Sequence, residues 1–556
     1  MNSSASAPET ATATRDTLPS QRFLWGTLLG LVAVLGLLGW FLVREFPARF
    51  YGADWLTGEH GNQLYRAQVL GSGGLLYRDV ECQYGPLPLY AYAAFAKVFG
   101  NTVQTGVAFH LCLSLVVVAA LFRWLARAAR SRNEALLLAG LLGLASLCLT
   151  VFYRSPLILS FGANFEYLSF ERLWLIGLAS GWRPLRERTA RDAFRIGLFL
   201  FLWQMTKFGG AAFGVAGYFL TDAVHLLLDG SRSDRRAWFP FWLRAGLACV
   251  AAEALRIGLF YAVLPPDLAV RTLWPLWVVS TYPYDRLDLW LSPQHFLVFI
   301  APIFVPVVVG LLATAVRLLP AARGWKADRM PEALWYPAGV LLAFYLCGSV
   351  NKVGYFGRQW LFFQYAFALV PVLLLLALRL PRVAGLGLAL GTYAASVAMF
   401  LRTAAVKPSS TMIRVETPVG FVWGGRQDPE ILIWQAARGW LEARPGSQMI
   451  VFSNWLGGGW YAAERKWAPL RNTLFVTGTR TAADQDQLRA QLPKTDLLVC
   501  FLTGPGKKGP TENRLERLRQ ELSRVLPADL LQRVLDEYTV AETDPGLENW
   551  LLLRHR

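Results

Sequence analysis

Apolar runs of membrane length recur along most of this chain of 556 residues. A run of about 18 or more apolar residues is long enough to cross a bilayer as an α-helix. Inside a bilayer every backbone N–H and C=O group needs a partner within the protein, and a helix provides these partners locally. Hydrophobic residues make up 54% of the sequence and charged residues 17%, which is too apolar for a soluble protein of this size. The sequence therefore predicts a polytopic α-helical membrane protein.

The formal net charge of the chain is +17, and its cations gather in alternate connectors between the apolar runs. The arginine-rich connectors are residues 123–132, 183–195, 232–236, 317–329 and 379–382. Lysine and arginine concentrate in the cytoplasmic loops of membrane proteins, so we expect these connectors and the N-terminus in the cytoplasm. The same distribution argues against a nucleic-acid partner, because the basic charge follows the membrane topology and does not form a separate basic segment.

This charge pattern divides the apolar runs into about eleven expected transmembrane helices. They are residues 23–43, 106–124, 135–152, 168–182, two spans within 194–228, then 238–264, 295–318, 334–350, 360–378 and 383–401. The run 194–228 must leave and re-enter the cytoplasm because both of its flanks are arginine-rich, and its outer hinge is expected near residues 207–210. Residues 87–99 are amphipathic and are expected to lie along the membrane face. An odd number of spans places the C-terminus outside the cytoplasm.

Three regions follow from these boundaries. Residues 1–22 form an Ala/Ser/Thr-rich cytoplasmic tail that is expected to be disordered. Residues 23–401 form the membrane domain, with its first outer loop at 44–105. Residues 402–556 are more polar, with helix-like segments at 429–441 and 512–525 and strand-like segments at 449–454, 497–502 and 551–553. This alternation predicts a small extracytoplasmic α/β domain.

The first outer loop carries a polar sequence suited to a reaction at a membrane face. Glu59 and His60 come shortly after the first span, and a partly desolvated carboxylate there can act as a general base toward an acceptor hydroxyl. Arg78 and Asp79 follow a glycine-rich turn and are candidates for substrate contact. The alternatives are a solvated loop charge for Glu59 and a surface ion pair for Arg78 and Asp79.

Three cations outside this loop are candidates for binding a phosphate group. Lys207 interrupts an apolar run at membrane depth, where a cation is costly, and Lys352 and Arg358 flank a short outer turn. The guanidinium of arginine can contact a phosphate with two parallel hydrogen bonds. The alternatives are snorkelling for Lys207 and interfacial anchoring for the other two. Glu253 and Arg256, three residues apart in one expected helix, instead predict a structural ion pair.

The remaining polar residues give weaker signals. Glu166, at the end of the second outer loop, is a candidate second carboxylate. Cys82 and Cys500 are both expected outside the cytoplasm and could pair, but the six cysteines have no CxxC or metal-type spacing, so isolated thiols are expected. Residues 504–509 lack the GK[ST] ending of a Walker A loop. The motifs therefore predict neither a nucleotide site nor a metal site.

The motifs of the first outer loop resemble those of the GT-C glycosyltransferases, in particular protein mannosyltransferases and aminoarabinose transferases. The family pattern is an acidic pair, Tyr-x-Ala-Gln, a glycine-rich turn, Tyr-Arg-Asp, an aromatic segment with proline, and Phe-Gly. In this chain the corresponding residues are Glu59-His60, Tyr65-Arg66-Ala67-Gln68, Gly73-Gly74, Tyr77-Arg78-Asp79, Tyr84-Gly85-Pro86-Leu87 and Phe99-Gly100. A second patch, Val451-Phe452 followed by Tyr461 and Arg465, is similar to an element that family members carry near the C-terminus.

The resemblance implies a GT-C-like fold in a bacterial inner membrane. It also implies inverting transfer of a sugar from a polyprenyl-phosphate donor to a lipid, protein or glycan acceptor at the outer face. The catalytic candidates are then Glu59, His60 and Asp79. The candidates for binding substrate or phosphate are Tyr65, Arg78, Glu166, Lys207, Lys352 and Arg358.

The chain departs from the family pattern at two positions. The acidic pair is Glu59-His60 here, which keeps one carboxylate as the base but argues against a bound divalent metal. Gly85 stands where a lysine often precedes the proline, so a phosphate contact would have to come from Lys207, Lys352 or Arg358.

Two other classes of function are compatible with a polytopic chain. A transporter or flippase of a lipid-linked or anionic solute would use Lys207, Glu253 and Arg256 to line a path, but the sequence has no inverted repeat, and transport needs no folded outer domain. A non-catalytic membrane subunit would use the loop residues only to anchor partners.

Overall fold

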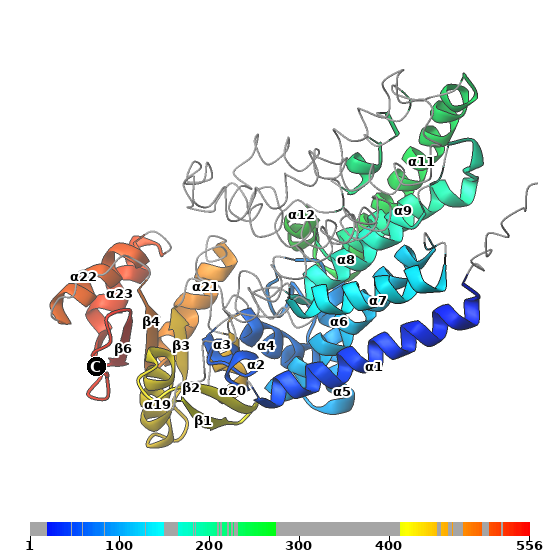
Figure 1. Ribbon diagram of the computed structural model, residues 1–556. Helices are drawn as coiled ribbons and strands as arrows, with labels where there is room; N and C mark the ends of the chain where they lie inside the picture. Colours follow the sequence, from blue (N-terminus) through cyan, green and yellow to red (C-terminus); the bar gives the residue numbers. More distant parts are fainter. Residues whose placement is uncertain are drawn as a thin grey trace, which may run out of the picture.

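A computed structural model gives the fold of the chain (Figure 1). It describes residues 19–148, 165–207, 211–226, 232–273, 412–452, 458–464, 482–502 and 511–556, and residue 470, apart from single residues and pairs within these ranges. The spans expected at 295–401, with Lys352 and Arg358, lie outside the described residues, as does Arg465. The number of eleven spans therefore stays a prediction.

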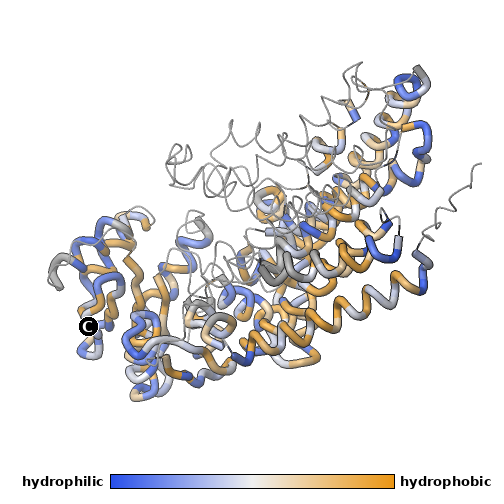
Figure 2. The backbone as a smooth tube through the Cα atoms, viewed as in Figure 1, coloured by the Kyte–Doolittle hydropathy of each residue, from blue (hydrophilic) through white to orange (hydrophobic). Residues whose placement is uncertain are grey.

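Long apolar helices form the membrane domain. They are α1 (Gln21–Glu45), α6 (Val103–Ala126), α7 (Arg132–Cys148), α8 (Phe165–Ala179), α9 (Ala190–Gln204) and α11 (Arg232–Val263). By length and composition α1, α6 and α11 can cross a membrane. The helices pack in the pairs α1–α6, α1–α7, α6–α8, α8–α9 and α9–α11, and the hydrophobic colour follows them in Figure 2. The mostly helical, apolar architecture that the sequence predicts is confirmed, with three helices long and apolar enough to cross a membrane among the described residues.

Local sequence fixes where several of these helices begin. Thr102 caps α6, because its side-chain oxygen accepts a hydrogen bond from the N–H of Thr105 at 3.2 Å. Thr189 and Asp192 form a capping box at the start of α9. The end of α9 at Gln204 leaves Lys207 outside the helix, as expected for a hinge near this residue.

Short helices make up much of the first outer loop. They are α2 (Pro47–Phe50), α3 (Asp54–Thr57), α4 (Glu59–Gly71) and α5 (Leu87–Phe99). The helix α5 has the bounds that its amphipathic pattern predicts. Glu59 is not in an irregular loop, because it begins α4, whose residues Leu64, Tyr65 and Ala67 are buried in the core. Burial of these apolar side chains stabilises α4 although its sequence is polar.

Two other boundaries differ from the sequence-based prediction. Helix α8 begins at Phe165, so Glu166 lies in its first turn and not in the second outer loop. Helix α12 (Pro266–Leu273) occupies the start of the segment expected to be the third outer loop. Proline at the first position and an acidic residue in the first turn favour this helix start. The aromatic residues expected in the rest of that loop lie outside the described residues.

The C-terminal region is an α/β domain that begins with a hairpin. Strands β1 (Met412–Thr417) and β2 (Gly420–Gly425) form this antiparallel hairpin. A second sheet has the strand order β3-β4-β6-β5 and consists of β3 (Met449–Phe452), β4 (Leu497–Phe501), β5 (Tyr538–Val540) and β6 (Trp550–His555). Strands β3 and β4 are parallel, while β6 is antiparallel to β4 and β5. The helices are α19 (Pro429–Glu442), α20 (Gly458–Glu464), α21 (Ala482–Gln491), η4 (Leu492–Lys494), α22 (Thr511–Leu522) and α23 (Ala528–Glu537).

Both faces of the four-stranded sheet are buried, because successive strand residues point to opposite faces. Ile450, Leu498 and Leu551 belong to a cluster that is completed by α21, α22 and α23. Val451, Val499 and Leu552 belong to a cluster that continues into the first outer loop and α6. The C-terminal domain therefore shares a hydrophobic core with the membrane domain and is not an independent appendage.

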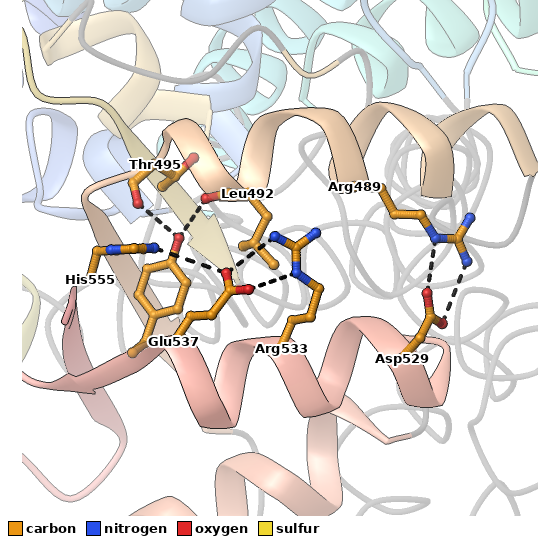
Figure 3. A network of polar contacts seen from close by, with 8 residues as sticks. Arg489, Leu492, Thr495, Asp529, Arg533, Glu537 and His555 are labelled. Atoms are coloured by element: carbon orange, nitrogen blue, oxygen red, sulfur yellow. Dashed lines mark hydrogen bonds and ion pairs between the residues drawn. The ribbon is translucent and has the colours of Figure 1, made fainter.

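Polar contacts tie α21 and η4 to α23 and the adjoining strand (Figure 3). Arg489 of α21 contacts Asp529 of α23 at 2.9 Å. Within α23, Arg533 contacts Glu537 at 2.9 Å. The hydroxyl of Tyr538 lies 2.7 and 2.8 Å from the backbone oxygens of Leu492 and Thr495 and can donate its proton to either. Exposed ion pairs contribute little stability, so the buried tyrosine hydroxyl is the more important of these contacts.

The hairpin β1–β2 attaches the C-terminal domain to the first outer loop. The N–H of Trp423 donates to the oxygen of Tyr51 at 2.5 Å, and the Gln104 amide donates to the oxygen of Phe421 at 3.1 Å. In addition, α20 packs against α3 and α4. No disulfide joins Cys82 and Cys500, which are both buried.

Candidate functional site

A tight turn follows α4 and presents the Tyr-Arg-Asp motif. Asp79 stabilises this turn, because its carboxylate accepts a hydrogen bond from the N–H of Leu75 at 2.7 Å and its own N–H donates to the oxygen of Leu75 at 2.9 Å. The guanidinium of Arg78 contacts the same carboxylate at 2.8 Å. These hydrogen bonds, above all the one from Arg78, hold the pKa of Asp79 below its usual value. Asp79 thus remains ionised and occupied in holding the turn.

Tyr77 lies at the centre of this turn with a φ of 69°, a left-handed conformation that is rare for a residue with a side chain. Its buried hydroxyl donates to the backbone oxygen of Tyr84 at 2.5 Å, and its ring lies 5.6 Å from that of Phe260 on α11. Burial raises the pKa of Tyr77 well above its usual value, so the phenol keeps its proton. Such a backbone costs roughly 1–3 kcal/mol, which the surrounding contacts must offset.

The Tyr-Gly-Pro-Leu motif pairs with the end of α9 through its backbone. The N–H of Gly85 donates to the oxygen of Thr206, and the N–H of Leu87 donates to the oxygen of Met205, both at 2.9 Å. A Cβ atom at Gly85 would lie 2.2 Å from the backbone of Met205. Only glycine fits this close approach, which explains why this chain has no lysine at the position.

This pairing brings Lys207 to the first outer loop. Its ammonium lies over the ring of Tyr84, 5.3 Å from the ring centroid. Thr206 is fixed from the other side, because its hydroxyl accepts a hydrogen bond from the Trp174 indole of α8 at 3.0 Å. The structure therefore brings together Lys207 and the motif that the sequence marked as a candidate site.

Replacement of Gly85 by alanine is expected to separate the motif from the end of α9. The methyl group would overlap the backbone of Met205, so the free energy of unfolding should fall by about 1–3 kcal/mol. Thermal unfolding of the purified protein in detergent measures this loss. Gly71→Ala is the matched control, because a Cβ at Gly71 has no atom within 4 Å. Equal stability of both variants would contradict the close approach.

Two further cations lie around the same turn. Arg66 of α4 is buried, and its Nε donates to the backbone oxygen of Glu81 at 3.0 Å. Arg256 of α11 is buried and binds Glu253 with two hydrogen bonds, of 2.9 and 2.5 Å. Both cations act electrostatically on Tyr77. The Glu253–Arg256 pair is the structural ion pair that the spacing predicts, and it lies beside the candidate site.

The sequence did not assign a role in phosphate binding to Arg66 or Arg256. The position of Arg256 could have indicated such a role, because a cation near the end of an apolar helix is energetically costly and is often functional. Arg66 lies within the Tyr-Arg-Ala-Gln motif, but the motif alone does not show that Arg66 is on a helix and faces the turn.

His60, the second residue of α4, lies in a cluster of aromatic rings. Its ring stacks on Trp55 at 4.8 Å and meets His110 of α6 edge to face at 5.7 Å. A nitrogen of His110 lies 3.1 Å from the Gln63 side-chain oxygen. This buried position suits packing of the loop onto α6 better than contact with a substrate. Gly106 permits the packing, because a Cβ there would lie 2.3 Å from Trp55.

The other predicted residues take the following places. Glu59 is the first residue of α4, Tyr65 is buried on the same helix, and Glu166 is the second residue of α8. The turn places Arg78 at the surface, while Lys352 and Arg358 lie outside the described residues. Among the residues that the structure describes, no three His, Cys, Asp or Glu side chains are grouped in a way that could hold a metal ion.

Comparison with known proteins identifies the fold. No protein-family model and no curated protein sequence matches the chain. The structure of ArnT from Cupriavidus metallidurans in the apo state is similar over 95% of this chain and 98% of that chain, with a TM-score of 0.51 and 12% sequence identity. A structure of the same protein bound to undecaprenyl phosphate has a TM-score of 0.48 at the same coverage and identity. The chain therefore shares its overall fold with ArnT.

Proposed function

We propose that the chain is an inverting glycosyltransferase of the GT-C type, which moves a sugar from a polyprenyl-phosphate donor to an acceptor hydroxyl. The first-loop motifs and the fold shared with ArnT support the reaction class. The apolar helices provide the hydrophobic environment that a lipid tail requires. The turn that carries Tyr77 and Arg78 lies against one of them, α11, and provides polar groups. Sugar and acceptor are left open: lipid, protein and glycan acceptors all present hydroxyl groups.

Glu59 is the proposed general base. Its carboxylate takes the proton of the acceptor hydroxyl as the acceptor oxygen forms a bond to the anomeric carbon of the sugar. The bond between that carbon and the phosphate oxygen breaks on the opposite face, and polyprenyl phosphate leaves with the electron pair. Asp79 is less suited to this role, because both its oxygens are engaged in the turn.

The observation that carries the proposal is the position of Lys207 on Tyr84. A phosphate that leaves with additional negative charge is stabilised by cations already fixed in place. Lys207 lies just after α9 and over Tyr84, while Arg66 of α4 and Arg256 of α11 act electrostatically on Tyr77 in the same loop. Lys207 thereby takes over the phosphate contact that the family pattern would place at Gly85. Lys352 and Arg358 remain further candidates for the same contact.

Replacement of Lys207 by methionine tests this role. We expect transfer from a polyprenyl-phosphate sugar, measured as kcat/KM with the release of polyprenyl phosphate, to fall about 10- to 100-fold, because one charged contact to the leaving group is lost. Lys207→Arg should retain most of the activity, since it keeps the charge.

Lys97→Met is the matched control, because Lys97 is an exposed cation at the end of α5 in the same loop. Its activity should equal that of the unmodified protein. Activity of Lys207→Met at the level of the control would remove Lys207 from the phosphate site. Uptake of a lipid-linked solute into vesicles without sugar transfer would instead support a transporter.

A further inference from the structure

The end of the helix bundle opposite the candidate site carries a group of three arginines from three segments. Arg127 is the C-cap of α6, Arg183 follows α8, and Arg195 lies in α9. Arg195 donates to the backbone oxygen of Gly177 at 2.7 Å and to the side-chain oxygen of Ser180 at 2.8 Å. Arg127 donates to the backbone oxygen of Ser180 at 3.5 Å. We name this group the Ser180 arginine cluster.

Like charges surround Arg195 in this cluster. Arg127 and Arg183 both act as like charges on Arg195, and Asp192 acts on it as an opposite charge. Asp192 is itself engaged, because it accepts hydrogen bonds from the N–H and hydroxyl of Thr189. The carbonyl groups at the end of α8 carry only partial charges. Among the described residues, the cluster therefore has more positive than negative charge.

The other acidic residues described near this end of the helices do not neutralise this excess. Asp222 is bound by both terminal nitrogens of Arg188 and by the Trp242 indole, so its charge is already matched. Glu187 is exposed on η1 (Leu185–Glu187). Arg127 and Arg183 are exposed as well, which leaves their guanidinium groups accessible to a ligand.

An apolar surface begins directly beside the cluster. Phe194 and Leu198 lie on one side of α9, next to Arg195, and are 66% and 43% exposed. Arg127 directly follows α6, a helix long enough to cross a membrane. Hydrophilic residues gather at this end of the helices, and the hydrophobic colour begins next to them (Figure 2). A ligand that meets both surfaces must have an anionic group and an apolar tail.

We propose that the Ser180 arginine cluster binds the phosphate of an anionic phospholipid, whose acyl chains lie along Phe194 and Leu198. Arginines between membrane helices are suited to phosphate headgroups, since each guanidinium can form two parallel hydrogen bonds to phosphate oxygens. The site is separate from the proposed sugar-transfer site and does not depend on that proposed function. A bound lipid would join the ends of α6, α8 and α9.

The test compares lipid binding by the purified full chain and by two double variants. Native mass spectrometry with phosphatidylglycerol and phosphatidylcholine gives the ratio of the two dissociation constants. We expect the unmodified protein to favour phosphatidylglycerol about tenfold, and Arg127→Gln/Arg183→Gln to reduce this preference to about twofold or less. Arg235→Gln/Arg236→Gln is the control, because it removes two exposed arginines from the same end of the bundle at the start of α11.

Two results would overturn the proposal. An equal loss of preference in both double variants would show that only overall charge attracts the lipid. Displacement of the lipid by inorganic phosphate at millimolar concentration would show a site for free anions. Thermal unfolding of each variant without added lipid separates these outcomes from a folding defect, and sugar transfer by Arg127→Gln/Arg183→Gln in detergent should be unchanged.

Discussion

Glu59→Gln is expected to abolish sugar transfer while the protein remains folded. Glutamine has nearly the same shape as glutamate but cannot accept the proton of the acceptor hydroxyl, and loss of a general base lowers kcat about 10²- to 10⁴-fold. The folded state should be little affected. A carboxylate at a helix N-terminus contributes about 0.3–1 kcal/mol, so the unfolding temperature should fall only slightly. Single-turnover assays with a polyprenyl-phosphate sugar measure the chemical step.

Asp79→Asn is the informative comparison, because Asp79 is a second carboxylate of the same loop with a structural position. It should weaken the turn and lower the unfolding temperature while sugar transfer persists. Transfer by Glu59→Gln at the unmodified rate would show that another group is the base. Glu166, in the first turn of α8, would then be the next candidate.

Asp222→Asn is expected to give the largest loss of stability. The side chains of Arg188 and Asp222 are 0% and 1% exposed, and the pair is bidentate, with contacts of 2.5 and 2.6 Å. Removal of one charge leaves the other buried without its counter-ion, so the free energy of unfolding should fall by about 3–5 kcal/mol. The rings of Tyr218 and Phe241 lie against Arg188 and offer it no replacement anion.

Two variants make this prediction specific. Asp192→Asn weakens the capping box of α9 and removes a charge that does not contact Arg188 directly, so it should cost only about 1 kcal/mol. Arg188→Met/Asp222→Leu removes both charges and should recover most of the stability that Asp222→Asn loses. Chemical denaturation in detergent micelles provides the measurement. A double variant as unstable as Asp222→Asn would show that packing, and not charge balance, governs this region.

The membrane helices could be predicted because their signal is local. The apolar lengths of α1, α6 and α11 lie in the sequence itself, and the bounds of α5 follow from its pattern and from Pro86. The strands β3, β4 and β6 were also expected, since short apolar runs between polar segments mark buried strands. Their pairing order could not be read from the same runs.

Elements whose stability depends on distant partners were missed. The hairpin β1–β2 is held by residues of the first loop and α6 that lie hundreds of positions earlier. The helix α4 has a polar sequence, and its burial depends on α20. His60 was expected beside the chemistry, but its place depends on Trp55 and His110, and the sequence does not show that these rings meet.

The candidate site could be predicted only in part. The motifs identified the loop, and the charge rule placed a hinge near Lys207. The contact between them consists of backbone hydrogen bonds from Gly85 and Leu87, and such bonds leave no side-chain signature apart from the glycine itself. The backbone pairing of Gly85 with the segment after α9 therefore explains two observations. It requires glycine where the family pattern often has lysine, and it brings Lys207 to the first loop.

The bond between Gln104 and Phe421 joins residues 317 positions apart, and this separation has a consequence for biosynthesis. A growing chain emerges from the ribosome N-terminus first, so the early loop is synthesised long before its late partner has been translated. This contact can therefore form only after residue 421 has been synthesised. A stop codon before position 421 would leave the first loop without this partner.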